Sequence, residues 1–169
     1  MKKIISLAIV LVLIVTAIPS QSFAADCRYA TTQNFLNYLD NRGITYTLKG
    51  LDSDDDEVVT IEYTGNNKSS IETRWYFDND PVRVEVKVWY VIKYSVKDYY
   101  YVLEAVNQIN SDYRYVKFFA DISDNSVTAQ FDMPISANNA GEMCYDVLRR
   151  MINVIDDAYL SLRKYDTGS

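Results

Sequence analysis

The sequence predicts an α+β fold, in which an antiparallel sheet of about six strands is packed by three helices. Two patterns carry this prediction. From residue 82 to residue 94, valine, isoleucine and tyrosine alternate with charged residues, the period of a strand whose sheet has one wet face. From Cys144 to Leu162, apolar residues recur in alternating steps of four and three, the period of a helix that covers a sheet. The expected order is helix, four strands, helix, two strands and helix.

The first half of the predicted domain holds one helix and four strands. The helix begins near Thr31 or Thr32, either of which can cap it, and it ends at Gly43. Residues 65–67, whose types tolerate a positive φ, and residues 78–81 form turns between strands. The expected strands cover residues 44–48, 58–64, 71–77 and 82–94.

The second half begins with a helix that a capping box of Ser95 and Asp98 opens and that runs to Asn110. A hairpin follows, and the last helix carries the long apolar stripe. This stripe is expected to cover the sheet, with self-association of part of it as the alternative. The expected elements after the helix are strands 115–122 and 127–135, a turn at 123–126, and a helix that opens at Asn138 or Asn139.

The first 24 residues have the pattern of a secretory signal peptide. Two lysines precede an apolar run over residues 4–18, and small residues at Ser22 and Ala24 suit cleavage after Ala24. The run is shorter than the roughly 20 apolar residues of a membrane span, and no second run of that length follows. We expect an exported, extracytoplasmic protein with one domain over residues 25–169 and no membrane span in the mature chain.

The charge of the chain argues against two classes of partner. The full sequence carries 17 basic and 23 acidic residues, a net charge of −6. Removal of Lys2 and Lys3 with the signal peptide leaves 15 basic and 23 acidic residues, a net charge of −8. Nucleic acid and anionic membranes are bound through clustered lysine and arginine, so neither is an expected partner.

The chain contains no histidine. This absence removes Ser-His and Cys-His catalysis and the usual zinc sites, so we expect no catalytic residue, cofactor or metal ligand. The acidic run 52–56 resembles part of a calcium loop, but Glu57 stands where such a loop needs glycine, and a solvated turn is favoured. A hydrolase that uses two carboxylates needs no histidine and stays a distant alternative.

Two cysteines occur, Cys27 near the mature N-terminus and Cys144 in the last expected helix. Export places both where a disulfide can persist, so the two can pair. The alternative is that they never meet, because separation in sequence says nothing about the geometry of the two Cβ atoms.

Aromatic residues supply the candidate interaction surface. The chain has 15 tyrosines, and three of them stand in a row as Tyr99, Tyr100 and Tyr101. At about 100° per residue these three cannot all face inward from one helix. Trp89 lies in the polar phase of its strand. Exposed aromatic rings suit partner surfaces, and packing over sheet edges is the alternative role.

The chain resembles the YbjN family, whose domain is similar in fold to the type III secretion chaperones. The resemblance spans residues 31–164 and rests on the element order, on the closing helix and on four stretches. It implies a non-enzymatic, homodimeric domain that binds a protein or peptide, and it implies no site residue. The four stretches are residues 74–80, 106–110, 115–118 and 127–132.

These observations lead to one expected function and two alternatives. The expectation is an exported interaction module for a protein or peptide, working as a homodimer. A module that binds cell-wall glycans through exposed aromatic rings is the first alternative, and the carboxylate hydrolase is the second.

Overall fold

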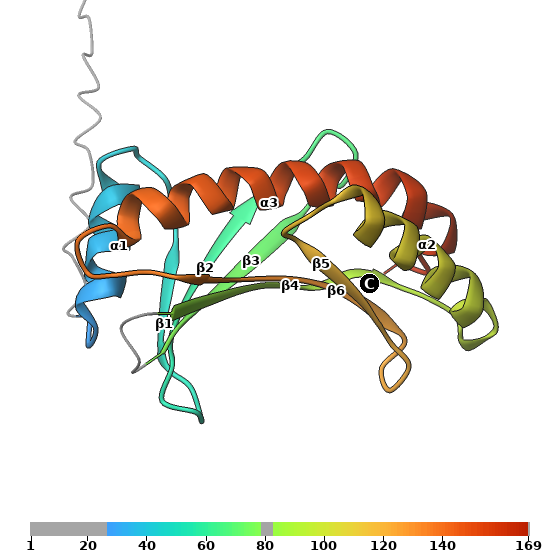
Figure 1. Ribbon diagram of the computed structural model, residues 1–169, viewed down its shortest axis with the longest axis horizontal. Helices are drawn as coiled ribbons and strands as arrows, with labels where there is room; N and C mark the ends of the chain where they lie inside the picture. The colour runs from blue at the N-terminus through green and yellow to red at the C-terminus, as the bar shows by residue number, and fades with distance from the viewer. Residues whose placement is uncertain (1–26, 79–82, 169) are drawn as a thin grey trace, which may run out of the picture.

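The computed structural model describes residues 27–78 and 83–168 and confirms the α+β fold and the order of its elements (Figure 1). The expected signal peptide, the turn at 79–81 and Val82 lie outside these residues. The described helices are α1 (Ala30–Asp40), α2 (Tyr99–Asp112) and α3 (Ala140–Leu162), and the strands are β1 (Thr47–Leu51), β2 (Glu57–Tyr63), β3 (Ile71–Phe77), β4 (Arg83–Lys93), β5 (Lys117–Asp121) and β6 (Ser126–Pro134).

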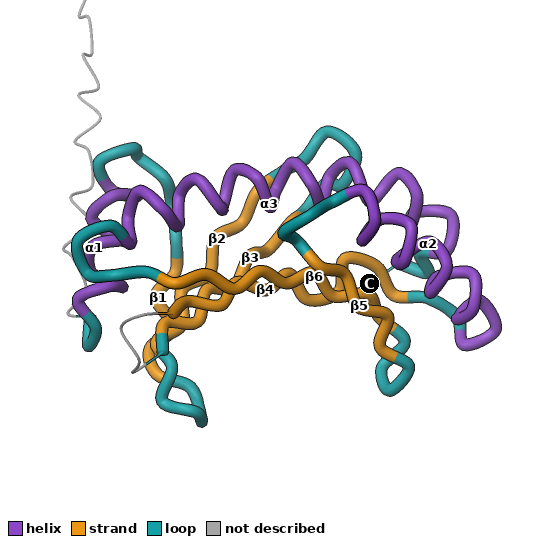
Figure 2. Tube along the Cα trace, viewed as in Figure 1, coloured by secondary structure: helices purple, strands orange, loops and turns teal. Residues whose placement is uncertain are grey.

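The six strands of the described chain form one sheet in the order β1-β2-β3-β4-β6-β5, with every neighbouring pair antiparallel. The helices lie on one side of this sheet, and α3 runs along it (Figure 1). The β1-β2 and β5-β6 hairpins extend away from the helices on the other side (Figure 2). The sheet therefore has an inner face under the helices and an outer face that no described helix covers.

The core forms where the inner face of the sheet meets the helices. Trp75 and Phe77 of β3 are fully buried, and the Phe35 ring of α1 lies 4.9 Å from the Trp75 ring. Full burial of side chains of this size stabilises the fold by about 1.5–3 kcal/mol each. The apolar stripe of α3 packs against its own sheet and is unavailable for self-association, since all its members are buried: Cys144, Leu148, Met151, Ile155, Ala158 and Leu162.

The start of α1 differs from the sequence prediction. The helix begins at Ala30, and Thr31 and Thr32 are buried in its first turn, so neither caps it. The preceding backbone is held from a distant strand, because the Glu57 carboxylate accepts hydrogen bonds from the N–H of Arg28 at 2.9 Å and of Tyr29 at 3.1 Å.

Two further boundaries differ. The first strand begins at Thr47, three residues later than expected, because the N–H of Ile44 donates to the Leu39 carbonyl and completes the end of α1. The capping box expected at Ser95 and Asp98 is absent. The residues after Ser95 form a short 3₁₀ helix instead, and α2 begins at Tyr99 without a side-chain cap.

The turn at 65–67 forms, but for a reason other than a positive φ. The carboxylate of Asp156 on α3 accepts the N–H of Asn66 at 3.0 Å, of Asn67 at 2.8 Å and of Lys68 at 2.9 Å. A Cβ at Gly65 would overlap this carboxylate, so glycine is needed there for space. The loop is therefore fixed to α3 by one charged side chain.

We expect Asp156→Asn to lower the free energy of unfolding by about 1–3 kcal/mol at pH 7, since hydrogen bonds to a charged acceptor are lost. The N–H of Lys68, with those of Asn67 and Asn66, lowers the pKa of Asp156 in the folded state. This stabilisation is present above the unfolded-state value of about 3.9 and is lost as the pH falls through the folded-state pKa.

Urea unfolding at pH 7 and pH 3 measures the loss of stability in Asp156→Asn and its dependence on pH. The difference in free energy of unfolding between Asp156→Asn and the parent protein should be smaller at pH 3 than at pH 7. The exposed neighbour Asp157 supplies the control Asp157→Asn. Equal stability of the two variants at pH 7 would show that Asp156 does not fix the loop.

Candidate binding groove

The four aromatic residues of the predicted interaction surface lie in different environments. Trp89 is 38% exposed, and its Nε1–H donates to the hydroxyl of Tyr76 at 3.0 Å. Tyr99 packs against the core, whereas Tyr100 and Tyr101 are 79% and 60% exposed. Two of the three consecutive tyrosines therefore face outward. Their role in binding stays a prediction.

Cys144 is a free thiol in the structure. Cys144 is buried on the core side of α3, and Cys27 is half-buried before α1. Burial raises the pKa of the Cys144 thiol, so this group is protected from reagents that attack thiolates.

The acidic turn between β1 and β2 is ordered by its own side chains. The Asp52 carboxylate accepts the N–H of Asp54 at 2.9 Å and of Asp56 at 3.0 Å. Burial, together with the negative charges of Asp52 and Asp78, raises the pKa of Asp56. Among the residues described, no three histidine, cysteine or acidic side chains are grouped so that they could hold a metal ion.

The outer face of the sheet carries paired charges. Arg74 Nε lies 2.6 Å from Glu72, and Lys87 Nζ lies 2.7 Å from Glu85. The side-chain amide of Gln130 also donates to Glu85. These charges neutralise one another within the face. No helix of the described chain is long and apolar enough to cross a membrane.

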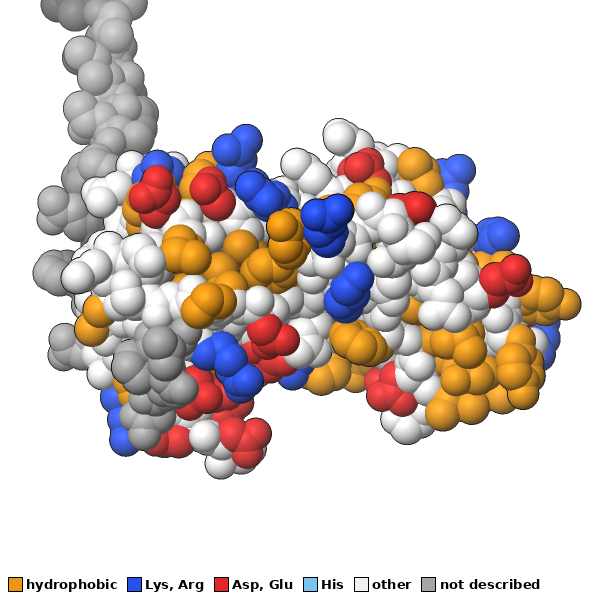
Figure 3. All heavy atoms as spheres, in the orientation of Figure 1, with side chains coloured by type: hydrophobic (Ala, Val, Ile, Leu, Met, Phe, Trp, Pro, Cys, Tyr) orange, Lys and Arg blue, Asp and Glu red, His pale blue; other side chains and the backbone are white. Residues whose placement is uncertain are grey.

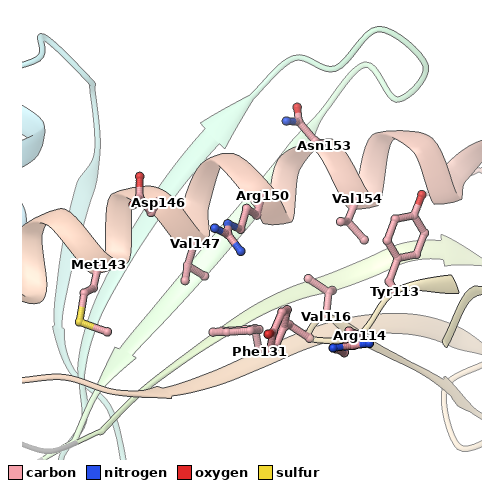
Figure 4. Close-up of a pocket in the computed structure, with 11 residues that line it drawn as sticks. Tyr113, Arg114, Val116, Phe131, Met143, Asp146, Val147, Arg150, Asn153 and Val154 are labelled. Carbon is pink, nitrogen blue, oxygen red and sulfur yellow. The ribbon is translucent and has the colours of Figure 1, made fainter. Parts of the chain in front are cut away.

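An apolar groove of about 510 Å³ lies between α3 and the inner face of the sheet (Figure 4). Met143, Val147 and Val154 of α3 point into it and face Val116 and Phe131 across the hollow. We call this hollow the α3 groove. Its other lining residues are Tyr113, Arg114, Tyr115, Asp146, Arg150 and Asn153.

The α3 groove exists because β5 is shorter than its partner β6. The pairing of the two strands ends where Lys117 stands opposite Gln130, and β6 continues to Pro134 paired with β4 alone. Asn110 of α2 holds the start of β5, since its side chain donates to the Phe118 carbonyl and accepts the Phe118 N–H, both at 2.8 Å. The last four residues of β6 thus have a strand on only one side.

The charged side chains at the α3 groove are arranged asymmetrically. Asp146 and Asn153 point away from the sheet, whereas Arg114 and Arg150 lie at the groove (Figure 4). Neither arginine has an ion-pair partner among the described residues. The local positive charge contrasts with the acidic chain as a whole, and Figure 3 shows it beside hydrophobic side chains below α3.

Sequence analysis missed the α3 groove, although part of its pattern was visible. Met143, Val147 and Val154 recur at steps of four and seven, one position before members of the core stripe. They form a second apolar stripe that widens the apolar face of α3 beyond what the sheet covers.

The comparisons with known proteins concern the fold. No family model and no curated protein matches the sequence. The solved structure of YbjN, a candidate transcription regulator from E. coli, is similar with a TM-score of 0.50 and 12% identity over 76% of this chain and 91% of that chain. The ExsC-ExsE complex gives a TM-score of 0.42 and 12% identity over 81% and 94%. The expected YbjN-like fold is confirmed, and no residue role is carried over at this identity.

We expect a thiol reagent to leave Cys144 unlabelled in the native mature protein and to label it after unfolding. Cys144 should be protected in the native protein, because it is buried and its pKa is raised. Mass spectrometry of the labelled protein, prepared without reductant, identifies the site. Absence of any reactive thiol before and after unfolding would show that the two cysteines pair.

Proposed function

We propose that the chain is an exported, non-enzymatic module that binds a segment of another protein or a peptide in the α3 groove. One observation carries the proposal: Phe131, the first residue of β6 beyond its pairing with β5, and the second apolar stripe of α3 meet in the same hollow. Export rests on the sequence of residues 1–24, and a partner is therefore sought outside the cytoplasm.

The size and lining of the α3 groove suit a few apolar side chains. A volume of about 510 Å³ lies within the range of ligand-binding pockets. The Tyr115 ring, 62% exposed, stands edge-on to Phe131 at 6.2 Å and adds an aromatic wall. Burial of apolar side chains between this wall and α3 would supply the main binding free energy.

The edge of β6 that β5 leaves free would orient the bound segment. An extended segment can add to a strand edge through backbone hydrogen bonds while its alternate side chains enter a pocket. Arg114 and Arg150 favour a segment with at least one acidic residue, since neither arginine has a carboxylate partner in the described chain.

Homodimer formation is a further part of the proposal. Three exposed apolar or aromatic residues lie at the start of α2 and in the 3₁₀ helix before it, and we call them the tyrosine patch: Val96, Tyr100 and Tyr101. Figure 3 shows hydrophobic side chains gathered at this end of the molecule. Exposed aromatic clusters of this kind support self-association.

Glycan binding is the second candidate function. Trp89 and Tyr90 are 38% and 42% exposed on consecutive positions of β4, and exposed rings can stack on sugars. The free backbone edge of β6 and the two arginines of the α3 groove favour peptide binding over glycan binding.

We expect Val147→Glu to weaken peptide binding at the α3 groove at least about tenfold, since a buried carboxylate would replace apolar contact. The probe is a phage-displayed library of random 12-residue peptides selected on the parent protein. Fluorescence polarisation then measures the selected peptides on each variant.

The matched control is Leu160→Glu, which places the same charge on an exposed position of α3 outside the groove. Selected peptides should be apolar with acidic residues and should bind this control like the parent. Equal binding to Val147→Glu would remove the α3 groove as the site.

We expect light scattering of the mature protein at micromolar concentrations to give twice the mass of one chain. Tyr100→Ser combined with Tyr101→Ser should lower this mass towards that of the monomer, whereas Leu160→Ser should not. A monomeric mass for the parent protein at every concentration would contradict the dimer.

A further inference from the structure

Strands β3 and β4 pair over only part of their length. Their register runs from Phe77 opposite Val84 to Arg74 opposite Lys87 and ends there. Beyond Arg74, β3 continues to Ile71 paired with β2 alone. The sheet is therefore split between two of its central strands, and one edge of β3 is unpaired over three residues.

The other side of the split is a bulge in β4. The register against β6 passes from Val88 to Ile92, so residues 89–91 pair with neither neighbouring strand. Tyr90 has φ +57°, which is uncommon for a bulky side chain and costs of order 1–3 kcal/mol. The alternation in the sequence predicted that Tyr90 faces the core. The bulge instead turns its ring outward, so that prediction was wrong. Bulges commonly re-aim side chains next to binding sites.

A cleft of about 440 Å³ lies in the split, and we call it the β3-β4 cleft. One wall comes from β3 and the loop before it, and the other from the bulged part of β4. The end of α3 and the residues after it close one end. The lining residues are Lys68, Ser69, Ser70, Glu72, Arg74, Val88, Trp89, Tyr90, Tyr159, Asp166 and Gly168.

Lys68 is a cation of the cleft without an ion-pair partner in the described chain. Its Nζ lies 5.0 Å from the centre of the Tyr159 ring, whereas Arg74 is paired with Glu72 at 2.6 Å. Burial lowers the pKa of Lys68, and the charge of Asp166 partly offsets this effect. A carboxylate that entered the cleft would therefore gain a half-buried ammonium as its partner.

The position of Lys68 is fixed. Its backbone N–H donates to the Asp156 carboxylate at 2.9 Å, and its carbonyl accepts the Gly65 N–H at 2.9 Å. The loop therefore holds its side chain at the cleft without help from a ligand.

The C-terminal tail shows that β4 accepts an extended segment beside the cleft. Thr167 donates its N–H to the Lys93 carbonyl at 2.8 Å, and the Asp166 carboxylate accepts the Lys93 N–H at 3.4 Å. Between this contact at Lys93 and the last β3-β4 pair at Lys87, five residues of β4, 88–92, have no partner on the β3 side. At about 3.3 Å per residue, this length matches a peptide of three to five residues.

We propose that the β3-β4 cleft binds a short extended peptide through the free strand edges, with a carboxylate of the peptide on Lys68. The exposed rings of Trp89 and Tyr90 cover an apolar side chain of the bound peptide. The carboxylate belongs to the C-terminus of the peptide or to an aspartate or glutamate side chain. This site goes beyond the proposed function, because it shares no lining residue with the α3 groove.

Three libraries of N-acetylated pentapeptides test the proposal on the mature protein. Positions one, two, three and five are randomised without aspartate or glutamate, and position four is alanine in the first two libraries. The first ends in a free carboxylate, the second in an amide, and the third in an amide with glutamate fixed at position four. Mass spectrometry identifies retained peptides, and tryptophan fluorescence gives their affinities, since Trp75 is buried and Trp89 lines the cleft.

We expect the protein to retain peptides from the free-acid library, from the glutamate library or from both. It should retain none from the plain amide library. Lys68→Met should weaken retained peptides at least about tenfold while leaving the backbone bonds of residue 68 in place. The exposed Lys97 supplies the matched control Lys97→Met. Val147→Glu should leave these affinities unchanged, so failure of the groove and failure of the cleft are separate results.

Three outcomes would overturn the proposal. They are equal retention of all libraries, equal affinity of Lys68→Met and the parent protein, and a response of Trp89 fluorescence to chitotetraose but to no peptide. The last result would identify the cleft as a glycan site.

Discussion

The packing of α3 along the inner face of the sheet is the constraint on which the rest of the structure depends. This helix has 23 residues and a length of about 35 Å, so it reaches from one end of the sheet to the other. Its core stripe buries the inner face, and its flanking stripe forms one wall of the α3 groove. Near its C-terminus, Asp156 fixes the loop that carries Lys68, and Tyr159 closes the β3-β4 cleft. One helix thus positions both candidate sites.

Local patterns were enough to predict most of the fold. Strand β3 has the predicted bounds because its inward and outward residues alternate without interruption from Ile71 to Phe77. The stripe of α3 likewise has a single period over its whole length. Errors arose where a distant group decides the local structure. Glu57 holds the backbone before α1 from 28 residues away, and Asp156 holds the Asn67 turn from 89 residues away.

The candidate sites were less predictable than the fold, because both depend on strand pairing. The alternation of the β4 sequence continues through Tyr90, and no residue type there predicts a positive φ. The α3 groove requires that β5 stop pairing with β6 at Lys117, and Asn110 of α2, eight residues away in sequence, holds the neighbouring Phe118. Exposure of Tyr100 and Tyr101 was predictable, because it follows from helix geometry alone.

The unpaired strand edges are confined to a few places, and this distribution is informative. Proteins protect exposed edges with bulges, charges or covering elements, because a free edge recruits other chains. The β1 edge carries a bulge at Gly50, where φ is +85°, and a lysine beside it. The β5 edge is held by Asn110, and the tail covers Lys93 on β4. Two stretches keep a free edge, the end of β6 and the split between β3 and β4, and each adjoins a hollow with an aromatic wall and a cation that has no ion-pair partner in the described chain. This combination of a free strand edge, an apolar wall and a positive charge suits an extended segment that carries a carboxylate.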